Sequence, residues 1–224
     1  MPDEATFTVE RQRLLEAIDA TFADTVRETG LRAMDDRVRS AMAAVPRHVY
    51  VPAPLRAFAY DNRPLPIGHG QTISQPFIVA LMTALLELRP QDQVLEIGTG
   101  CGYQAAVLAH LAAQVTSVER EPELSARAAQ VLAAQGVRNV ELQVADGWLG
   151  WPAGAPYDAV IATAAAAALP PAWLQQISRG GRLVAPIGGR DEAQWLIVAH
   201  KSAAGIVTQR RTIAVRFVPL IHDA

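Results

Sequence analysis

The sequence predicts an α/β protein with a doubly wound, mostly parallel sheet, a helical and loop-rich N-terminal extension, and a C-terminal antiparallel hairpin. Three observations predict this fold class. Apolar runs of strand length alternate with helical segments after Pro90, a glycine-rich turn follows the first run, and two β-rich runs close the chain. With 224 residues, half of them hydrophobic, the chain is long enough for one compact domain. We expect residues 1–90 to pack as an extension on a core formed by residues 91–224.

The N-terminal extension is expected to begin with two helices. Between Glu10 and Arg27, apolar residues recur at intervals of three or four, which is the period of an amphipathic helix, and Gly30 is placed to end it. Asp35 and Asp36 then precede a shorter helix, which Pro46 stops.

Residues 46–76 are rich in proline and glycine and predict a long, loop-dominated region. An irregular stretch of this length in a compact domain is more often functional than idle. A helix is expected from Gln75 to Leu88, with Ser74 as its N-cap and Pro76 in its first turn.

The core is expected to alternate strand and helix, which is typical of a parallel sheet. Strands are predicted at Gln93–Ile97, Val115–Val118, Val140–Val144, Tyr157–Ala162 and Arg182–Pro186, and helices near Gly102–Leu111, Pro122–Ala134 and Pro171–Ile177. Gly180 and Gly181 are expected to turn the chain into the last of these strands. The final hairpin is predicted from Gln194–His200 and Arg211–Val218, joined by a polar turn that contains Gly205.

Composition limits the classes of partner and site. A formal net charge of −2 gives no general attraction to nucleic acid or to anionic lipid. The polar, acidic N-terminus has no apolar signal core, and the longest apolar run, residues 164–169 with its flanking strand, is too short to cross a bilayer. A single cysteine excludes an intrachain disulfide and a cysteine metal cluster. We therefore expect a cytoplasmic protein without a metal site, a membrane partner or a nucleic-acid partner.

The segment V-L-E-I-G-T-G-C-G, residues 94–102, is the first candidate binding site. Glycines allow positive φ and a close approach of the backbone to a ligand, and the following helix offers free N–H groups. The spacing Gly98-x-Gly100-x-Gly102 differs from the G-x-G-x-x-G of dinucleotide sites, because Tyr103 stands where the third glycine would fall. Glu96, just before the turn, suits the cationic S-adenosylmethionine, which has no pyrophosphate. Thr99 belongs to the same loop, and an ordinary tight turn without a ligand is the other interpretation.

Further polar residues follow the next strands, at the sheet edge where ligands of open α/β proteins bind. Glu119 is placed to bind both hydroxyls of a ribose, or it is a solvated acid at a strand end. Asp146 and Gly147 could accept a hydrogen bond from an adenine amino group, although Asp-Gly is also a common turn. Thr163 is followed by small residues that leave room for a ligand, and Cys101 at the helix start is expected to have a lowered pKa.

Longer motifs identify a family. They are P-R-H-V-Y-V-P at 46–52, R-P-L-P-I-G-H-G-Q-T-I-S-Q-P at 63–76, V-L-E-I-G-T-G-C-G-Y-Q, A-D-G-W-L-G-W, G-G-R-L-V-A-P-I-G and the terminal V-R-F-V-P-L. Together they resemble the protein-L-isoaspartate O-methyltransferase family, over about residues 35–220. The I-G-H-G-Q-T-I-S-Q-P motif is more specific than the glycine loop, which many methyltransferases share.

The resemblance implies a Rossmann-like methyltransferase that transfers a methyl group from S-adenosylmethionine to the α-carboxylate of L-isoaspartyl residues in damaged proteins. It places Ser74 at the family's active-site serine, and Gln71, Thr72 and Ile73 in a loop over the cofactor and the substrate. Substrate contacts are expected from His69, Ser74 and Val215, and the protein is expected to be a monomer. Ser74 could instead only cap the following helix, and both roles are compatible.

Several other functions remain open. The same fold could methylate another carboxylate, on a peptide or a small molecule, because the alanine-rich segment 164–168 and Ile221 depart from the family pattern. A non-catalytic S-adenosylmethionine-binding protein is a second alternative, which the retained Q-T-I-S-Q-P disfavours. The glycine spacing disfavours a nicotinamide oxidoreductase, and the lack of a G-x-S-x-G segment disfavours a Ser-His hydrolase.

Overall fold

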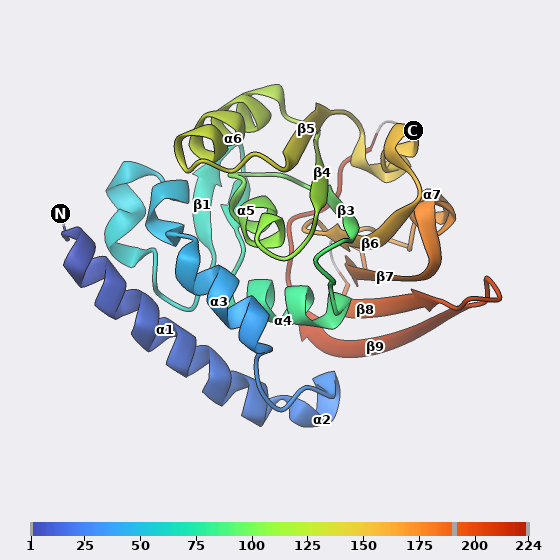
Figure 1. The fold of residues 1–224 in the computed structure, drawn as a ribbon, viewed down its shortest axis with the longest axis horizontal. Helices are drawn as coiled ribbons and strands as arrows, with labels where there is room; N and C mark the ends of the chain where they lie inside the picture. Colours follow the sequence, from blue (N-terminus) through green and yellow to red (C-terminus); the bar gives the residue numbers. More distant parts are fainter. Residues whose placement is uncertain (1, 190–191, 223–224) are drawn as a thin grey trace.

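The computed structural model describes residues 2–189 and 192–222 and contains a seven-stranded sheet in the order β5-β4-β3-β6-β7-β8-β9 (Figure 1). The first five strands in this order are parallel, and β8 and β9 continue the sheet in antiparallel pairing. The predicted fold class is therefore confirmed, including the C-terminal hairpin. The strands are β3 (Gln93–Ile97), β4 (Gln114–Glu119), β5 (Val140–Val144), β6 (Tyr157–Ala162), β7 (Ile177–Ile187), β8 (Gln194–Lys201) and β9 (Val207–Val215).

Helices or short turns follow the parallel strands, as the predicted β-α alternation requires. They are α5 (Tyr103–Ala109), α6 (Pro122–Ala134) and α7 (Pro171–Gln176), with short 3₁₀ turns η3 (Gly147–Leu149) and η4 (Pro152–Gly154) after β5. Among the described residues, no helix is long and apolar enough to span a membrane.

The central strands are apolar on both faces because both faces are covered. Side chains of successive strand residues point to opposite sides of a sheet. Accordingly, Val94 and Ile161 belong to a core cluster shared with α4 and α5, whereas Leu95 and Val160 belong to a second cluster around Trp173. The near-continuous apolar runs that predicted these strands are explained by this double burial.

The N-terminal extension forms two helical layers over one face of the sheet. The helices are α1 (Glu4–Asp24), α2 (Val26–Thr29), α3 (Asp36–Ala44) and α4 (Pro76–Leu86). Figure 1 shows α1 along the outer edge, with α3 and α4 between it and the sheet. All eleven residues of α4 are buried, because it contacts β6 and β7 on one side and α1 and α3 on the other.

The ends of the N-terminal helices follow local capping. The first helix begins at Glu4, earlier than predicted, because the Asp3 side chain accepts a hydrogen bond from the Thr6 N–H. The chain breaks at Thr25, and Gly30 ends α2 in the left-handed conformation rather than ending the long helix directly. Asp35, one of the two acids predicted to precede this helix, is the N-cap of α3.

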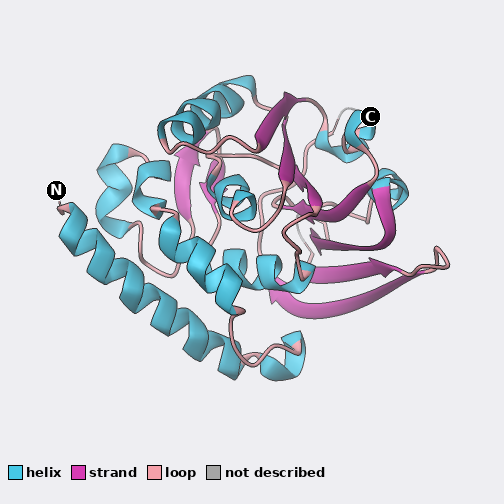
Figure 2. Ribbon diagram, viewed as in Figure 1, coloured by secondary structure: helices cyan, strands magenta, loops and turns pink. Residues whose placement is uncertain are grey.

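The segment predicted as loop-dominated contains a hairpin that the sequence analysis missed. Two 3₁₀ turns, η1 (Arg47–Tyr50) and η2 (Ala53–Phe58), are followed by β1 (Leu65–Gly68) and β2 (Gln71–Ile73), which pair antiparallel. The two residues between them, His69 and Gly70, have φ of 52° and 69°. Positive φ at both central residues is what a type I′ hairpin turn requires. Figure 2 shows this hairpin apart from the main sheet, among the helices.

Two strand boundaries were wrong. The strand β7 runs straight through Gly180 and Gly181, which the sequence analysis interpreted as a turn, and an irregularity in its pairing with β6 absorbs the extra residues. The last strand, β9, begins and ends earlier than predicted, so residues 216–222 leave the sheet and return toward its carboxyl edge.

Candidate functional site

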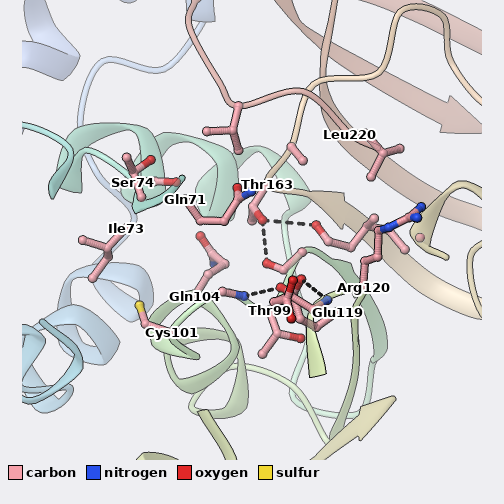
Figure 3. Close-up of a pocket in the computed structure, with 18 of the residues that line it drawn as sticks. Gln71, Ile73, Ser74, Thr99, Cys101, Gln104, Glu119, Arg120, Thr163 and Leu220 are labelled. Atoms are coloured by element: carbon pink, nitrogen blue, oxygen red, sulfur yellow. Dashed lines mark hydrogen bonds between the residues drawn. The ribbon is translucent and has the colours of Figure 1, made fainter. Parts of the chain in front are cut away.

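A cavity of about 200 Å³ lies at the carboxyl ends of β3, β4 and β6, between the β1-β2 hairpin and the C-terminal segment. Figure 3 shows Ile73 and Ser74 on one side of this cavity and Arg120 and Leu220 on the other. Most of the predicted site residues line it: His69, Gln71, Thr72, Ile73, Ser74, Gly98, Thr99, Gly100, Glu119, Gly147 and Thr163. The fold therefore brings the I-G-H-G-Q-T-I-S-Q-P segment and the glycine loop together.

Four predicted site residues do not line the cavity. Glu96 is fully buried below it, and Gly102 starts α5 behind it. The Asp146 side chain accepts a hydrogen bond from the Trp148 N–H, and the adjacent Gly147 forms the wall instead. Val215 lies at the end of β9, paired with Gln194, while the C-terminal part of the wall comes from residues 218–221.

Position 98, the first glycine of the loop, requires a glycine because of its backbone conformation and because of the side chain beside it. Gly98 has φ of +94°, and a Cβ atom there would lie 2.5 Å from the Thr163 Oγ1. That hydroxyl donates to the Gly98 carbonyl at 2.6 Å, which ties the end of β6 to the end of β3. A side chain at position 98 would therefore clash with the Thr163 hydroxyl and disturb this hydrogen bond.

The Glu119 carboxylate is held at the edge of the cavity by backbone groups. Its two oxygens accept hydrogen bonds from the Gly100 N–H at 2.8 Å and from the Glu121 N–H at 3.0 Å. A carboxylate has about four acceptor positions, so each oxygen keeps capacity for a hydroxyl donor. The backbone thus orients Glu119 for further hydrogen bonds from a ligand.

Glu96 supports the glycine loop through a chain of hydroxyls. The Ser117 hydroxyl donates to Glu96 Oε2 at 2.5 Å, and the Ser117 and Thr99 hydroxyls are 2.6 Å apart. Among the residues that the structure describes, none forms a hydrogen bond with the buried Glu96 Oε1. Burial, with a smaller effect of Glu119, raises the pKa of Glu96 to about 8, so the carboxyl group is mostly protonated at neutral pH.

The helix after Ser74 is capped by another residue, so the interpretation of Ser74 as its N-cap was wrong. The N-cap is Gln75, without a side-chain bond, and the Asn62 Oδ1 accepts from the Phe77 N–H at 3.0 Å. The Ser74 carbonyl accepts a hydrogen bond from Arg47 at 2.8 Å. Within the described chain, the Ser74 hydroxyl has no hydrogen bond, and it is therefore available to a ligand in the cavity.

The hairpin tip contacts the start of α6. His69 Nε2 lies 3.2 Å from the Glu123 carboxylate, and His69 Nδ1 lies 3.8 Å from that of Glu121. Because His69 also lines the cavity, these contacts position the tip beside the glycine loop.

Known proteins resemble this chain in sequence and in fold. The model of the family described as "Protein-L-isoaspartate(D-aspartate) O-methyltransferase (PCMT)" matches residues 19–224. The chain belongs to this family. A "Protein-L-isoaspartate O-methyltransferase 2" from Polaromonas sp. is 49% identical over 92% of this chain and 98% of its own length. A "Protein-L-isoaspartate O-methyltransferase 1" from Cupriavidus necator is 48% identical, over 95% of this chain and 82% of its own length.

Solved structures share the fold. A protein-L-isoaspartate O-methyltransferase is 26% identical with a TM-score of 0.79, and the match covers 93% of this chain and 65% of that one. A Plasmodium falciparum protein assigned to the same activity, solved with S-adenosyl-L-homocysteine, is 23% identical with a TM-score of 0.74 and is covered to 97%. The second likeness shows the fold alone.

Two residues that the sequence analysis did not single out, Gln104 and Arg120, also line the cavity of this isoaspartate methyltransferase family member. Gln104 is the last residue of the V-L-E-I-G-T-G-C-G-Y-Q motif, and Arg120 directly follows Glu119. The alanine-rich segment meets the C-terminal segment there, because the Ala165 N–H donates to the Val218 carbonyl and the Leu220 N–H donates to the Ala165 carbonyl. The expectation for Cys101 was wrong: burial raises the pKa of its thiol to about 11.

Proposed function

We propose that this protein transfers a methyl group from S-adenosylmethionine to the α-carboxylate of L-isoaspartyl residues in damaged proteins. The observation that carries the proposal is the convergence of two motifs on one cavity. Ser74 and its hairpin form one side, and the glycine loop with Glu119 forms the other. Membership of the protein-L-isoaspartate O-methyltransferase family over residues 19–224 supports the same reaction.

The residues of the cavity fit an adenosine-type cofactor. The backbone of Gly98 and Gly100 lines the cavity wall, and the Glu119 carboxylate keeps acceptor capacity for ribose hydroxyls. A Cβ atom at Gly147 would lie 2.6 Å from Ile97 Cγ2, so the backbone there stays close to the strand end. When bound, S-adenosylmethionine supplies an electrophilic methyl group on its sulfonium.

The protein's own part in the reaction is positioning. A carboxylate is ionised at neutral pH and is already a nucleophile, so no strong general base is needed. The Ser74 hydroxyl can donate a hydrogen bond to one carboxylate oxygen and leave the other directed at the methyl group. The hairpin and the C-terminal segment cover the cavity from two sides, which limits the water around the attacking oxygen.

The test compares an isoaspartyl peptide with its normal aspartyl twin and follows the methanol released from the unstable methyl ester. We expect methylation of the isoaspartyl peptide alone. In Ser74→Ala, turnover should fall roughly a hundredfold, because misplacement of the nucleophile is costly, whereas the affinity for S-adenosyl-L-homocysteine should change by less than about twofold. Equal methylation of the two peptides, or of neither, would contradict the repair function. Unchanged turnover in Ser74→Ala would refute the role of the serine.

A further inference from the structure

A buried arginine lies directly behind the serine loop. Arg47, the first residue of η1, has no exposed surface. Its Nη2 donates to the Ser74 carbonyl at 2.8 Å, its Nε donates to the Ala59 carbonyl at 2.9 Å, and its guanidinium lies 5.0 Å from the centre of the Tyr103 ring. Because Ser74 and Tyr103 both line the cavity, Arg47 connects the serine loop to the helix that follows the glycine loop.

The charge of Arg47 is not balanced by an acid. In the part of the chain that the structure describes, no carboxylate forms a salt bridge with it, and Nη1 is buried without any hydrogen-bond partner. The ionisable side chains that interact electrostatically with Arg47 are those of Tyr103, Cys101 and Tyr60. Burial raises the pKa of all three, to about 12 for Tyr103 and about 11 for Cys101, so they are neutral at physiological pH.

Such an arrangement destabilises the folded protein. Burial lowers the pKa of Arg47, yet a guanidinium stays protonated in proteins, so the charge remains. A buried ion without a partner loses hydration and gains no ion pair in return. Two carbonyl contacts could be made by a neutral amide at lower cost. The charged Arg47 at this position therefore points to an anionic group on a ligand that binds in the cavity.

We propose that Arg47 is a positioning residue with two effects: it fixes the Ser74 peptide group, and its unbalanced charge attracts the carboxylate of the substrate. This inference rests on the proposed function, because the isoaspartyl substrate brings a free α-carboxylate to Ser74. Two unit charges about 10 Å apart, at an effective dielectric constant of about 20, change an affinity by roughly tenfold. The effect is therefore measurable although Arg47 does not itself line the cavity.

The experiment separates the charge from the hydrogen bonds. Protein saturated with S-adenosyl-L-homocysteine is titrated with an isoaspartyl peptide and with the same peptide carrying an α-carboxamide in place of the α-carboxylate. The ratio of the two affinities is measured for the wild type, for Arg47→Lys, which keeps the charge, and for Arg47→Met, which removes it. Thermal unfolding and the affinity for S-adenosyl-L-homocysteine are measured for each variant as controls.

We expect the preference for the carboxylate peptide to fall roughly tenfold in Arg47→Met and to stay within about threefold of the wild type in Arg47→Lys. Turnover of Arg47→Lys should still fall, because an ammonium lacks the fork that holds two carbonyls at once. Equal weakening of both peptides in Arg47→Met would overturn the charge effect. If Arg47→Met does not fold, loss of the preference in Arg47→Lys overturns the proposal on its own.

The wild type tests the underlying function separately. If the wild type methylates the isoaspartyl peptide but both Arg47 variants keep the full preference for the carboxylate peptide, only the inference about Arg47 is refuted. A wild type that does not methylate the peptide refutes the repair function itself.

Discussion

Substitution of Gly98 by alanine tests how the glycine loop is built. The residue has φ of +94°, and its Cβ atom would lie 2.5 Å from Thr163 Oγ1, which is closer than real Cβ contacts. The left-handed backbone costs an alanine about 1–2 kcal/mol. The clash costs about 1–3 kcal/mol more, because the neighbouring hydroxyl must move and gives up its bond to the Gly98 carbonyl. We expect Gly98→Ala to lower the free energy of unfolding by about 2–5 kcal/mol.

The control is Gly136→Ala, at a site where alanine meets the unfavourable left-handed backbone but no steric clash. Gly136 has φ of +72°, and a Cβ atom there would meet nothing within 4 Å. Urea denaturation gives the free energy of unfolding of both variants, and their m-values should be equal. The loss at Gly98 should also be smaller when Thr163→Ala is already present, because the clashing oxygen is gone. Equal losses at Gly98 and Gly136, or full additivity with Thr163→Ala, would refute the reasoning.

Three further predictions concern the same region. Because the pKa of Glu96 is raised from 4.5 to about 8, the wild type should lose about 1.4 kcal/mol of stability per pH unit as the pH rises through this window, relative to Glu96→Gln. Urea titrations from about pH 5 to about pH 9 should show this difference growing and then levelling off, and parallel curves would contradict it. Glu119→Gln should weaken S-adenosyl-L-homocysteine binding about tenfold or more in calorimetry, because the charged acceptor is lost, and an unchanged affinity would exclude the ribose contact. Asn62→Ala should lower the free energy of unfolding by about 1 kcal/mol, since the Phe77 N–H loses its cap, whereas an unaffected stability would mean that water replaces it.

The core of the fold could be predicted because its strands have a recognisable local sequence pattern. The runs at β3 and β6 are largely apolar on both faces, the run at β5 alternates apolar and polar residues, and the bounds of all three matched the structure. Their carboxyl ends meet at one edge of a parallel sheet, and this brought Gly98, Glu119 and Thr163 together without any knowledge of distant contacts.

The remaining features depend on contacts between distant segments or on a local backbone conformation that the sequence pattern does not indicate. The cap of α4 comes from Asn62, which no local pattern could select over Ser74. The raised pKa of Cys101 comes from its burial, whereas its place at a helix start indicated a lowered pKa. The hairpin turn has His69 at a positive φ, a conformation that a histidine adopts uncommonly and that the sequence did not indicate.

A buried hydrogen bond between α4 and α5 is a second connection, besides Arg47, between the serine loop and the glycine loop. The Gln104 Nε2, in α5, donates to the Thr83 hydroxyl of α4 at 2.9 Å, and that hydroxyl donates to the Val79 carbonyl. Ser74 lies two residues before the first residue of α4, and the glycine loop precedes α5, so a shift between the two helices is a shift between the two halves of the site. A misplacement of about 1 Å can cost roughly a hundredfold in rate. Complete burial of α4 therefore serves the reaction as well as the fold, because its packing against α1, α3, β6 and β7 resists such a shift.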